Sequence, residues 1–254
     1  MKDRMRQITV IVTVLITLII NVLANALPLN GLNTGQISDR FKVYFVPAGY
    51  VFSIWGLIYI GFIAFAVFQA LPSQRENPRL RVTGWWISLG GLANSAWIFF
   101  WHYELFPLTL IAMLVLLGTL IITYLRLNMG RTSASAAETW AARLPFSIYL
   151  GWITVATVAN VTDVLDYLKW DGFGLAPEAW MGIMLIAVLV IAALMNFTRR
   201  DLAYTSVILW ALAGISVKFA AVPAVALPTW ITFGLVALTL AIVFVLRRPS
   251  TQTV

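Results

Sequence analysis

The sequence LPFSIYLGWITVATVANVTD, residues 144–163, decides the fold class of this chain. It is apolar and long enough for a membrane-crossing helix, yet polar and aromatic residues recur in it every three or four positions. That spacing places one set of residues on a single helix face: Pro145, Tyr149, Trp152, Ala156, Asn160 and Asp163. Because hydrocarbon offers an asparagine no hydrogen-bond partner, we expect this face to point into a helix bundle. The opposite face, with Ile148, Val155 and Val158, suits lipid or a neighbouring helix.

The composition indicates an integral membrane protein. Of the 254 residues, 61% are hydrophobic and 11% are charged, whereas soluble domains have about a quarter charged residues. The net charge of +7 could suit nucleic acid, but the basic residues are scattered over short loops, so we expect no nucleic-acid partner. The absence of cysteine excludes disulfides and thiolate chemistry, and one histidine, His102, leaves little for a metal site.

Apolar runs predict eight membrane spans joined by short loops, at about 8–29, 47–71, 82–101, 108–125, 144–163, 179–197, 202–220 and 230–246. Pro47 suits the first turn of the second span, and residues 223–228 are expected to form a turn. The first run has a signal-like Ala24-Asn25-Ala26, but its length favours a retained first span. We therefore predict an all-α, polytopic transmembrane helix bundle.

The basic residues test the span count independently of hydropathy. With the N-terminus in the cytoplasm, eight spans place 13 Lys and Arg residues, including Arg247 and Arg248, on the cytoplasmic side. The other side then holds four: Arg40, Lys42, Lys169 and Lys218. This bias is typical of the positive-inside rule. We predict that both termini are cytoplasmic, in a bacterial inner membrane.

Three of the predicted spans place aromatic and amide side chains at a similar depth. At about 1.5 Å per residue, one group lies between the bilayer middle and its outer edge: Trp55, Asn94, Trp97, Trp152 and Ala156. We interpret this group as the lining of one cavity for a flat, largely apolar ligand, with plain helix packing as the alternative. Tryptophans nearer the helix ends are expected to be interfacial anchors: Trp85, Trp86, Trp101, Trp170, Trp180 and Trp230.

The fifth predicted span also resembles a known family. Its motif P-F-x-x-Y-L-x-W-x-x-x-A-T-x-x-N, from Pro145 to Asn160, resembles the last helix of the TspO/translocator proteins, also called tryptophan-rich sensory proteins. The second span is similar to the family's P-x7-W-x3-Y through Pro47, Trp55 and Tyr59. The third is similar to its N-x2-W-x3-F-F, with closer spacing, through Asn94, Trp97 and Phe99-Phe100.

The resemblance implies a five-helix ligand-binding bundle over residues 1–170, to which we add a three-helix extension over residues 171–254 in the same membrane domain. It implies a pocket capped by residues 30–46 that binds porphyrins, haem-type precursors or sterol-like lipids, with no required cofactor. The cap lacks the family's tryptophan and proline pair. The motif positions and the polar face together give the candidate ligand contacts: Trp55, Tyr59, Asn94, Trp97, Tyr149, Trp152, Ala156 and Asn160. Glycines that permit close helix contacts leave room for a homodimer.

Three other features permit different chemistry. Lys218 in the seventh span could hold a retinal, although a lysine near a helix end more readily extends its amine to water. His102 and Glu104 could exchange protons, but an outer histidine is more simply solvated. The outer carboxylates could bind a divalent cation, although a solvated acidic loop is the commoner arrangement: Asp163, Asp166, Asp171 and Glu178.

The favoured interpretation is a membrane receptor, carrier or sensor for a hydrophobic small molecule, surrounded by membrane lipids and without catalytic or metal-binding residues. The alternative is a membrane enzyme that modifies such a ligand, for example by light-dependent porphyrin breakdown. A purely structural partner protein is the third possibility. The sequence contains no phosphate-binding loop or nucleophile motif, so hydrolysis and primary transport lack support.

Overall fold

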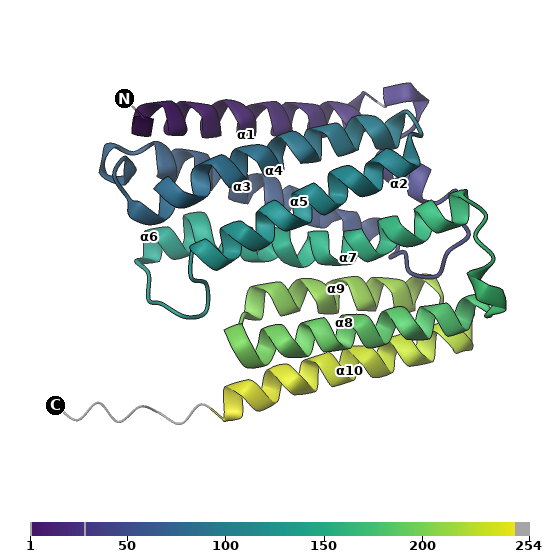
Figure 1. Cartoon of the computed structure of the whole chain (residues 1–254). Coiled ribbons are helices and arrows are strands. Elements are labelled where there is room, and N and C mark those ends of the chain that lie inside the picture. Colours follow the sequence, from purple (N-terminus) through teal and green to yellow (C-terminus); the bar gives the residue numbers. More distant parts are fainter. Residues whose placement is uncertain (1, 28, 247–254) are drawn as a thin grey trace.

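The computed structural model describes residues 2–27 and 29–246, in which eight long helices lie side by side (Figure 1). They are α1 (Lys2–Ala26), α3 (Ile54–Ala70), α4 (Pro78–His102), α5 (Phe106–Arg126), α7 (Leu144–Tyr167), α8 (Pro177–Arg199), α9 (Leu202–Lys218) and α10 (Pro223–Val245). Two short helices, α2 (Thr34–Ser38) and α6 (Ala136–Glu138), lie in the connections. The predicted all-α bundle is confirmed.

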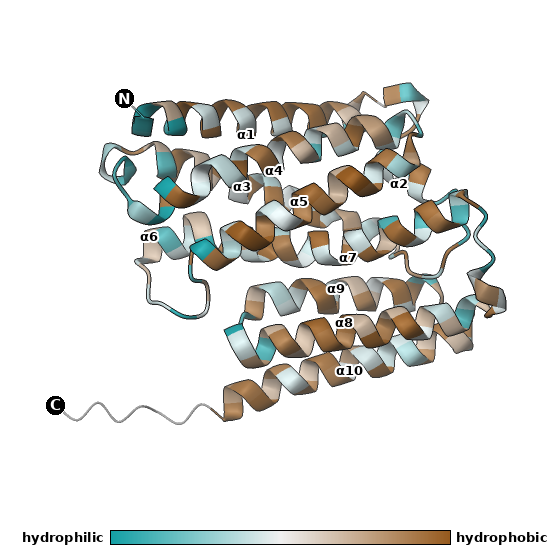
Figure 2. Cartoon of the chain, viewed as in Figure 1, coloured by the Kyte–Doolittle hydropathy of each residue, from teal (hydrophilic) through white to brown (hydrophobic). Residues whose placement is uncertain are grey.

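Six helical segments in the described part of the chain are long and apolar enough to cross a membrane. The span count of eight is therefore not reproduced by length and composition alone. Of the other two long helices, α9 has 17 residues, and α4 has 25 but contains many glycine, tryptophan and polar residues. Figure 2 shows apolar residues along the helices and hydrophilic ones in the connections, as expected for an integral membrane protein.

Several helix boundaries differ from the sequence expectation, and prolines account for most of the differences. Helices α4, α8 and α10 begin at Pro78, Pro177 and Pro223, because proline needs no N–H partner in a first turn. Consequently, the expected turn at residues 223–228 is the first part of α10. Pro47, in contrast, does not begin a helix: residues Gly49–Ser53 form a 3-10 turn, and α3 starts at Ile54.

The 3-10 segment before α3 packs against α9. The N–H of Ala48 donates to the carbonyl oxygen of Gly214 (3.3 Å), and the indole N–H of Trp210 donates to the carbonyl oxygen of Val51 (3.2 Å). A Cβ at Gly214 would overlap the Val51 side chain, so glycine permits this close approach. Helix α9 therefore fixes the position from which α3 starts.

Helix α7 lies at the centre of the bundle, in contact with α3, α5 and α9. The face expected to meet lipid or a neighbour meets neighbouring helices, and Val155 is only 2% exposed. A π-helical turn, Thr139–Arg143, precedes α7 and accommodates Pro145, which lacks an N–H for the helical ladder. Gly61 of α3 lies against Pro145, because a Cβ there would stand 2.8 Å from the proline Cβ.

Asp201 ties the C-terminal helices to the rest of the bundle. Its side chain caps α9 by accepting a hydrogen bond from the N–H of Tyr204 (3.0 Å). It also accepts hydrogen bonds from the hydroxyl of Tyr124 on α5 (2.8 Å) and from the hydroxyl of Ser147 on α7. One carboxylate thus joins three helices.

The connections between successive helices lie in turn at the two opposite ends of the bundle (Figure 1). We call the end that holds the start of α1 and the α8–α9 turn the basic end, and the end that holds α2 the pocket end. The basic end carries the described residues of the expected cytoplasmic set, whereas Arg247 and Arg248 lie outside the described residues. Which end faces the cytoplasm stays a prediction.

Candidate functional site

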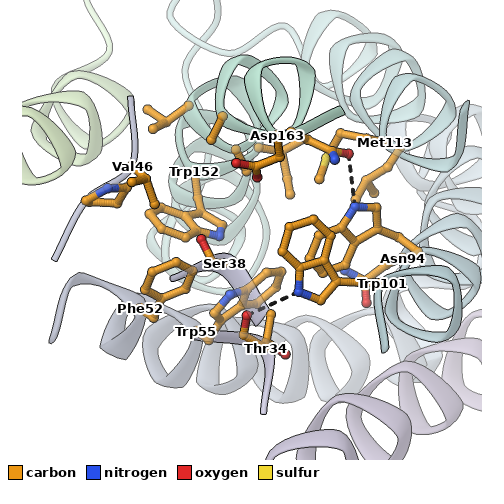
Figure 3. A pocket seen from close by; sticks show the side chains of 18 residues that line it. Thr34, Ser38, Val46, Phe52, Trp55, Asn94, Trp101, Met113, Trp152 and Asp163 are labelled. Atoms are coloured by element: carbon orange, nitrogen blue, oxygen red, sulfur yellow. Dashed lines mark hydrogen bonds between the residues drawn. The ribbon is translucent and has the colours of Figure 1, made fainter. Parts of the chain in front are cut away.

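A cavity of about 50 Å³ lies in the pocket half of the bundle, between α3, α4, α5 and α7 (Figure 3). It is lined by side chains from all four helices and from α2, which closes it at the pocket end. The structure brings six of the eight candidate residues to this cavity: Trp55, Asn94, Trp97, Trp152, Ala156 and Asn160.

Aromatic rings form most of the cavity wall. The ring of Trp152 stands edge-on to Trp55, with centroids 6.3 Å apart, and edge-on to Phe52, with centroids 5.6 Å apart. On the other side, Trp97 and Trp101 are stacked, with centroids 5.1 Å apart. Both arrangements are favourable for aromatic pairs. The wall therefore offers flat apolar surfaces with few hydrogen-bonding groups.

The buried amide of Asn160 is satisfied by neighbouring helices. Its Oδ1 accepts a hydrogen bond from the indole N–H of Trp97 (3.2 Å), and its Nδ2 donates to the hydroxyl of Thr109 (2.8 Å). Asn160 therefore connects α7 to α4 and α5 while it faces the cavity.

A second amide group connects α4 to α1 and α3. Asn94 Oδ1 accepts a hydrogen bond from Asn21 Nδ2 (2.6 Å), and Asn21 Oδ1 accepts one from the hydroxyl of Tyr59 (3.3 Å). Asn21, which was absent from the candidate set, is 1% exposed. The two amides thus hold the walls of the cavity together, and membrane-embedded polar groups generally need such partners.

Two candidate residues do not line the cavity. Tyr149 packs edge-on against Trp55 and Phe62, with centroids 6.0 and 5.0 Å apart, and lines a separate space of about 20 Å³. Tyr59 lines an open groove of about 460 Å³ between α1 and α3. Four residues line both this groove and the cavity, and so form the wall between them: Thr34, Phe52, Trp55 and Trp97.

Helix α2 is held over the cavity by an N-terminal capping box. Asn33 Oδ1 accepts a hydrogen bond from the N–H of Gln36, and the Gln36 side chain accepts one from the N–H of Asn33 (both 2.9 Å). An Asn followed three residues later by Gln is a recognisable start signal that our sequence reasoning missed. The carbonyl oxygen of Thr34 accepts a hydrogen bond from the indole N–H of Trp101 (3.1 Å), which ties α2 to α4.

The structure corrects the expectation that His102 is solvated. It is 1% exposed, and its ring nitrogens contact the Thr34 hydroxyl (3.2 Å) and the carbonyl oxygen of Leu29 (3.1 Å). Its proposed partner Glu104 instead pairs with Arg40 (2.5 Å), a hydrogen bond that raises the pKa of the Arg40 guanidinium. These contacts tether the cap and do not form a proton-transfer pair.

The amine of Lys218 on α9 pairs with Asp39 at the end of α2 (2.8 Å). Tyr44, further along the same connection, donates a hydrogen bond to Glu178 of α8 (3.0 Å), and this bond raises the pKa of the Tyr44 phenol. The C-terminal helices therefore hold the cap in place from a second side.

The sequence of this chain also matches a known protein family. Residues 7–245 match the family described as TSPO-like protein. The chain belongs to the TSPO-like family. The match continues through α8, α9 and α10, past residue 170, where the motif resemblance ended. Neither the search of curated proteins nor the search of solved structures returned a match. For this TSPO-like chain, the family and the apolar helices indicate membrane-associated ligand binding or sensing.

Sequence reasoning misplaced one residue of this TSPO-like cavity and gave two conflicting expectations for another. Trp101 was expected at the membrane interface, but it is 3% exposed and lines the cavity. Its position four residues after Trp97 was the available signal. Asp163 was expected both on the inward-pointing face of its helix and at the start of a solvated acidic loop. Helix α7 continues to Tyr167 and Asp163 is 3% exposed, so the structure agrees with the inward face and not with the loop.

Two polar atoms of the cavity lining have no hydrogen-bond partner among the described residues. They are Nε1 of Trp152 and Oδ1 of Asp163. Figure 3 shows both side chains at the cavity, and both belong to α7. Buried polar atoms are nearly always paired, so these two stand apart from the satisfied amides.

Proposed function

We propose that this chain is a membrane receptor, carrier or sensor that binds a flat, largely apolar ligand between α3, α4 and α7. A tetrapyrrole or a sterol-like lipid has this character. The observation that carries the proposal is the aromatic cavity whose wall contains an unpartnered indole N–H, that of Trp152. A ligand that stacks on these rings and accepts one hydrogen bond would satisfy that donor.

Ligand entry requires side chains in the wall to move. A cavity of about 50 Å³ holds only a few water molecules, which is too little for a tetrapyrrole. The adjacent groove of about 460 Å³ is separated from it by side chains that include Phe52 and Trp55, both half-buried. Rotation of these two rings would join the spaces, and the joined volume falls in the range of small-molecule sites.

Saturable binding of etioporphyrin, a tetrapyrrole without carboxylates, tests the proposal. The purified chain is titrated in phosphatidylcholine nanodiscs while its tryptophan fluorescence is recorded, and empty nanodiscs give the lipid partition to subtract. We expect Trp152→Leu to weaken the affinity about tenfold or more, because it removes both a stacking ring and the free N–H.

Trp85→Leu is the matched control, because Trp85 lies on α4, is 53% exposed and is absent from the cavity lining. The dissociation constant of etioporphyrin from this variant should equal that from the unmodified chain. Equal weakening in the two variants, or quenching that empty nanodiscs reproduce, would contradict the proposed function.

A further inference from the structure

Asp163 is a buried carboxyl group without a partner. Its side chain lies one turn before the end of α7 and lines the cavity, beside α2. Its Oδ1 is inaccessible to solvent and receives no hydrogen bond from the described residues. An unpaired buried carboxyl group is costly for a protein to keep, whereas an apolar residue would fill the same space at no such cost.

The charges around Asp163 leave it without a cation of its own. No described hydrogen bond or ion pair gives Asp163 a basic partner, and the amine of Lys218, at the same end of the bundle, is already paired with Asp39. An ammonium group at the pocket end of the cavity would therefore meet a carboxyl oxygen that no described group engages.

The rest of the lining suits an organic cation and not a metal ion. Metal ions such as Ca²⁺ and Mg²⁺ take six or more oxygen ligands, and no cluster of three or more His, Cys, Asp or Glu residues occurs in the described ranges. Asp163 instead shares the cavity lining with tryptophan rings, whose faces attract ammonium groups. An ammonium group would donate hydrogen bonds to the unpartnered oxygen and neutralise its charge.

We infer that Asp163 selects, for this cavity, a flat aromatic ligand that carries a protonated amine. The inference rests on the proposed function and narrows its ligand class. The aromatic part of the ligand stacks on the rings of Trp55 and Trp152, and its amine faces Asp163 at the pocket end. Asp163 is thus a specificity-determining residue, distinct from the amides that hold the helices together.

A pair of probes that differ only in charge tests this inference. We use 2-(1-naphthyl)ethylamine, which is protonated at pH 7, and 2-(1-naphthyl)ethanol, its neutral counterpart. Binding to the full chain in phosphatidylcholine nanodiscs is measured by calorimetry, with empty nanodiscs as the reference. We expect the unmodified chain to prefer the amine about tenfold or more, the usual contribution of a charge-assisted hydrogen bond.

Asp163→Asn keeps the shape of the side chain and removes its charge. We expect it to reduce the preference for the amine to about threefold or less, with affinity for the alcohol unchanged. Asp166→Asn, three residues away on the same helix, makes the same charge change outside the cavity and should keep the preference. Because Asp163 has no partner to lose, Asp163→Asn should be at least as resistant to thermal unfolding as the unmodified chain.

The outcomes separate this inference from the proposed function. Equal affinity for the two probes, a preference that survives Asp163→Asn, or an equal loss in Asp166→Asn would overturn the role of Asp163. So would a marked loss of thermal stability in Asp163→Asn, which would indicate a structural partner. If the inference fails while Trp152-dependent binding of etioporphyrin persists, the proposed function stands. If neither probe nor etioporphyrin binds, both fail.

Discussion

Replacing Gly151 with alanine should weaken the packing of α7 against α9. A Cβ at this position would lie 2.9 Å from the carbonyl oxygen of Tyr204, 3.1 Å from Val207 Cβ and 3.4 Å from Tyr204 Cα. Two of these three atoms belong to the backbone of α9, so no side-chain rotation relieves the contact. The helices themselves must separate by a few tenths of an ångström.

The magnitude follows from two opposing terms. An extra methyl group in a well-packed contact destabilises a protein by about 1–3 kcal/mol. Alanine also favours the helix over glycine by up to about 1 kcal/mol, which partly offsets the loss. Gly182→Ala on α8 is the matched control, because a Cβ there meets nothing within 4 Å and adds only the favourable term. The free energies of unfolding of the two variants should therefore differ by about 1–3 kcal/mol.

Reversible unfolding by dodecyl sulfate in mixed micelles measures this difference. We expect Gly151→Ala to unfold at a lower dodecyl sulfate fraction than Gly182→Ala. It should also weaken etioporphyrin binding, because Trp152 is the next residue and moves with the helix. If the two variants agree within about 0.5 kcal/mol, as unrelated surface substitutions do, the close approach of α7 and α9 is wrong.

Two further substitutions test the polar contacts between helices in the same unfolding assay. Asn160→Leu should lower the free energy of unfolding by about 1–2 kcal/mol, because it removes two interhelical hydrogen bonds. Thr109→Val removes one of these two bonds and should lower it less; equal losses would refute the bridging role of Asn160. Asp201→Ala should cost about 1–3 kcal/mol, because it removes the cap of α9 and leaves two hydroxyls without an acceptor. Asp171→Ala, in an exposed turn, serves as its control, and a similar cost for both would contradict the role of Asp201.

The fold class was predictable because its determinants are local. An apolar run of about 20 residues specifies a spanning helix wherever the chain lies in the bundle. The regular spacing along α7 likewise identified the face that meets the cavity, since helical geometry is the same in every fold. The helix ends were less predictable. Prolines begin α4 and α10 as first-turn residues, but Pro47 lies against Gly214 of α9, which is distant in sequence, and the chain makes a 3-10 turn before α3 begins.

The errors at the site share one physical cause. Distance from a helix end was used to judge exposure. It assigned Trp101 to the interface, His102 to solvent and Asp163, despite its place on the inward-pointing face, to a solvated loop. Helix α2 packs against α4 and closes the cavity that Asp163 of α7 lines, and it is held there by Thr34 and by the pair of Asp39 with Lys218. Hydropathy along the sequence does not show which residues a distant helix will bury. The capping box of α2 was visible in the sequence, but the surface that it covers was not.

A polar residue inside a membrane protein is usually taken as a sign of function, because lipid gives it no partner. In this bundle the polar residues at the cavity fall into two groups, those with hydrogen-bond partners and those with unpartnered atoms. Asn94 and Asn160 have partners on other helices, so their polarity is explained by assembly of the walls, and their substitution should first affect stability. Trp152 and Asp163 have unpartnered polar atoms at the same cavity, and helix assembly does not account for those two atoms. Their free hydrogen-bonding capacity is what a bound ligand would use, and binding should be the property that their substitution changes first.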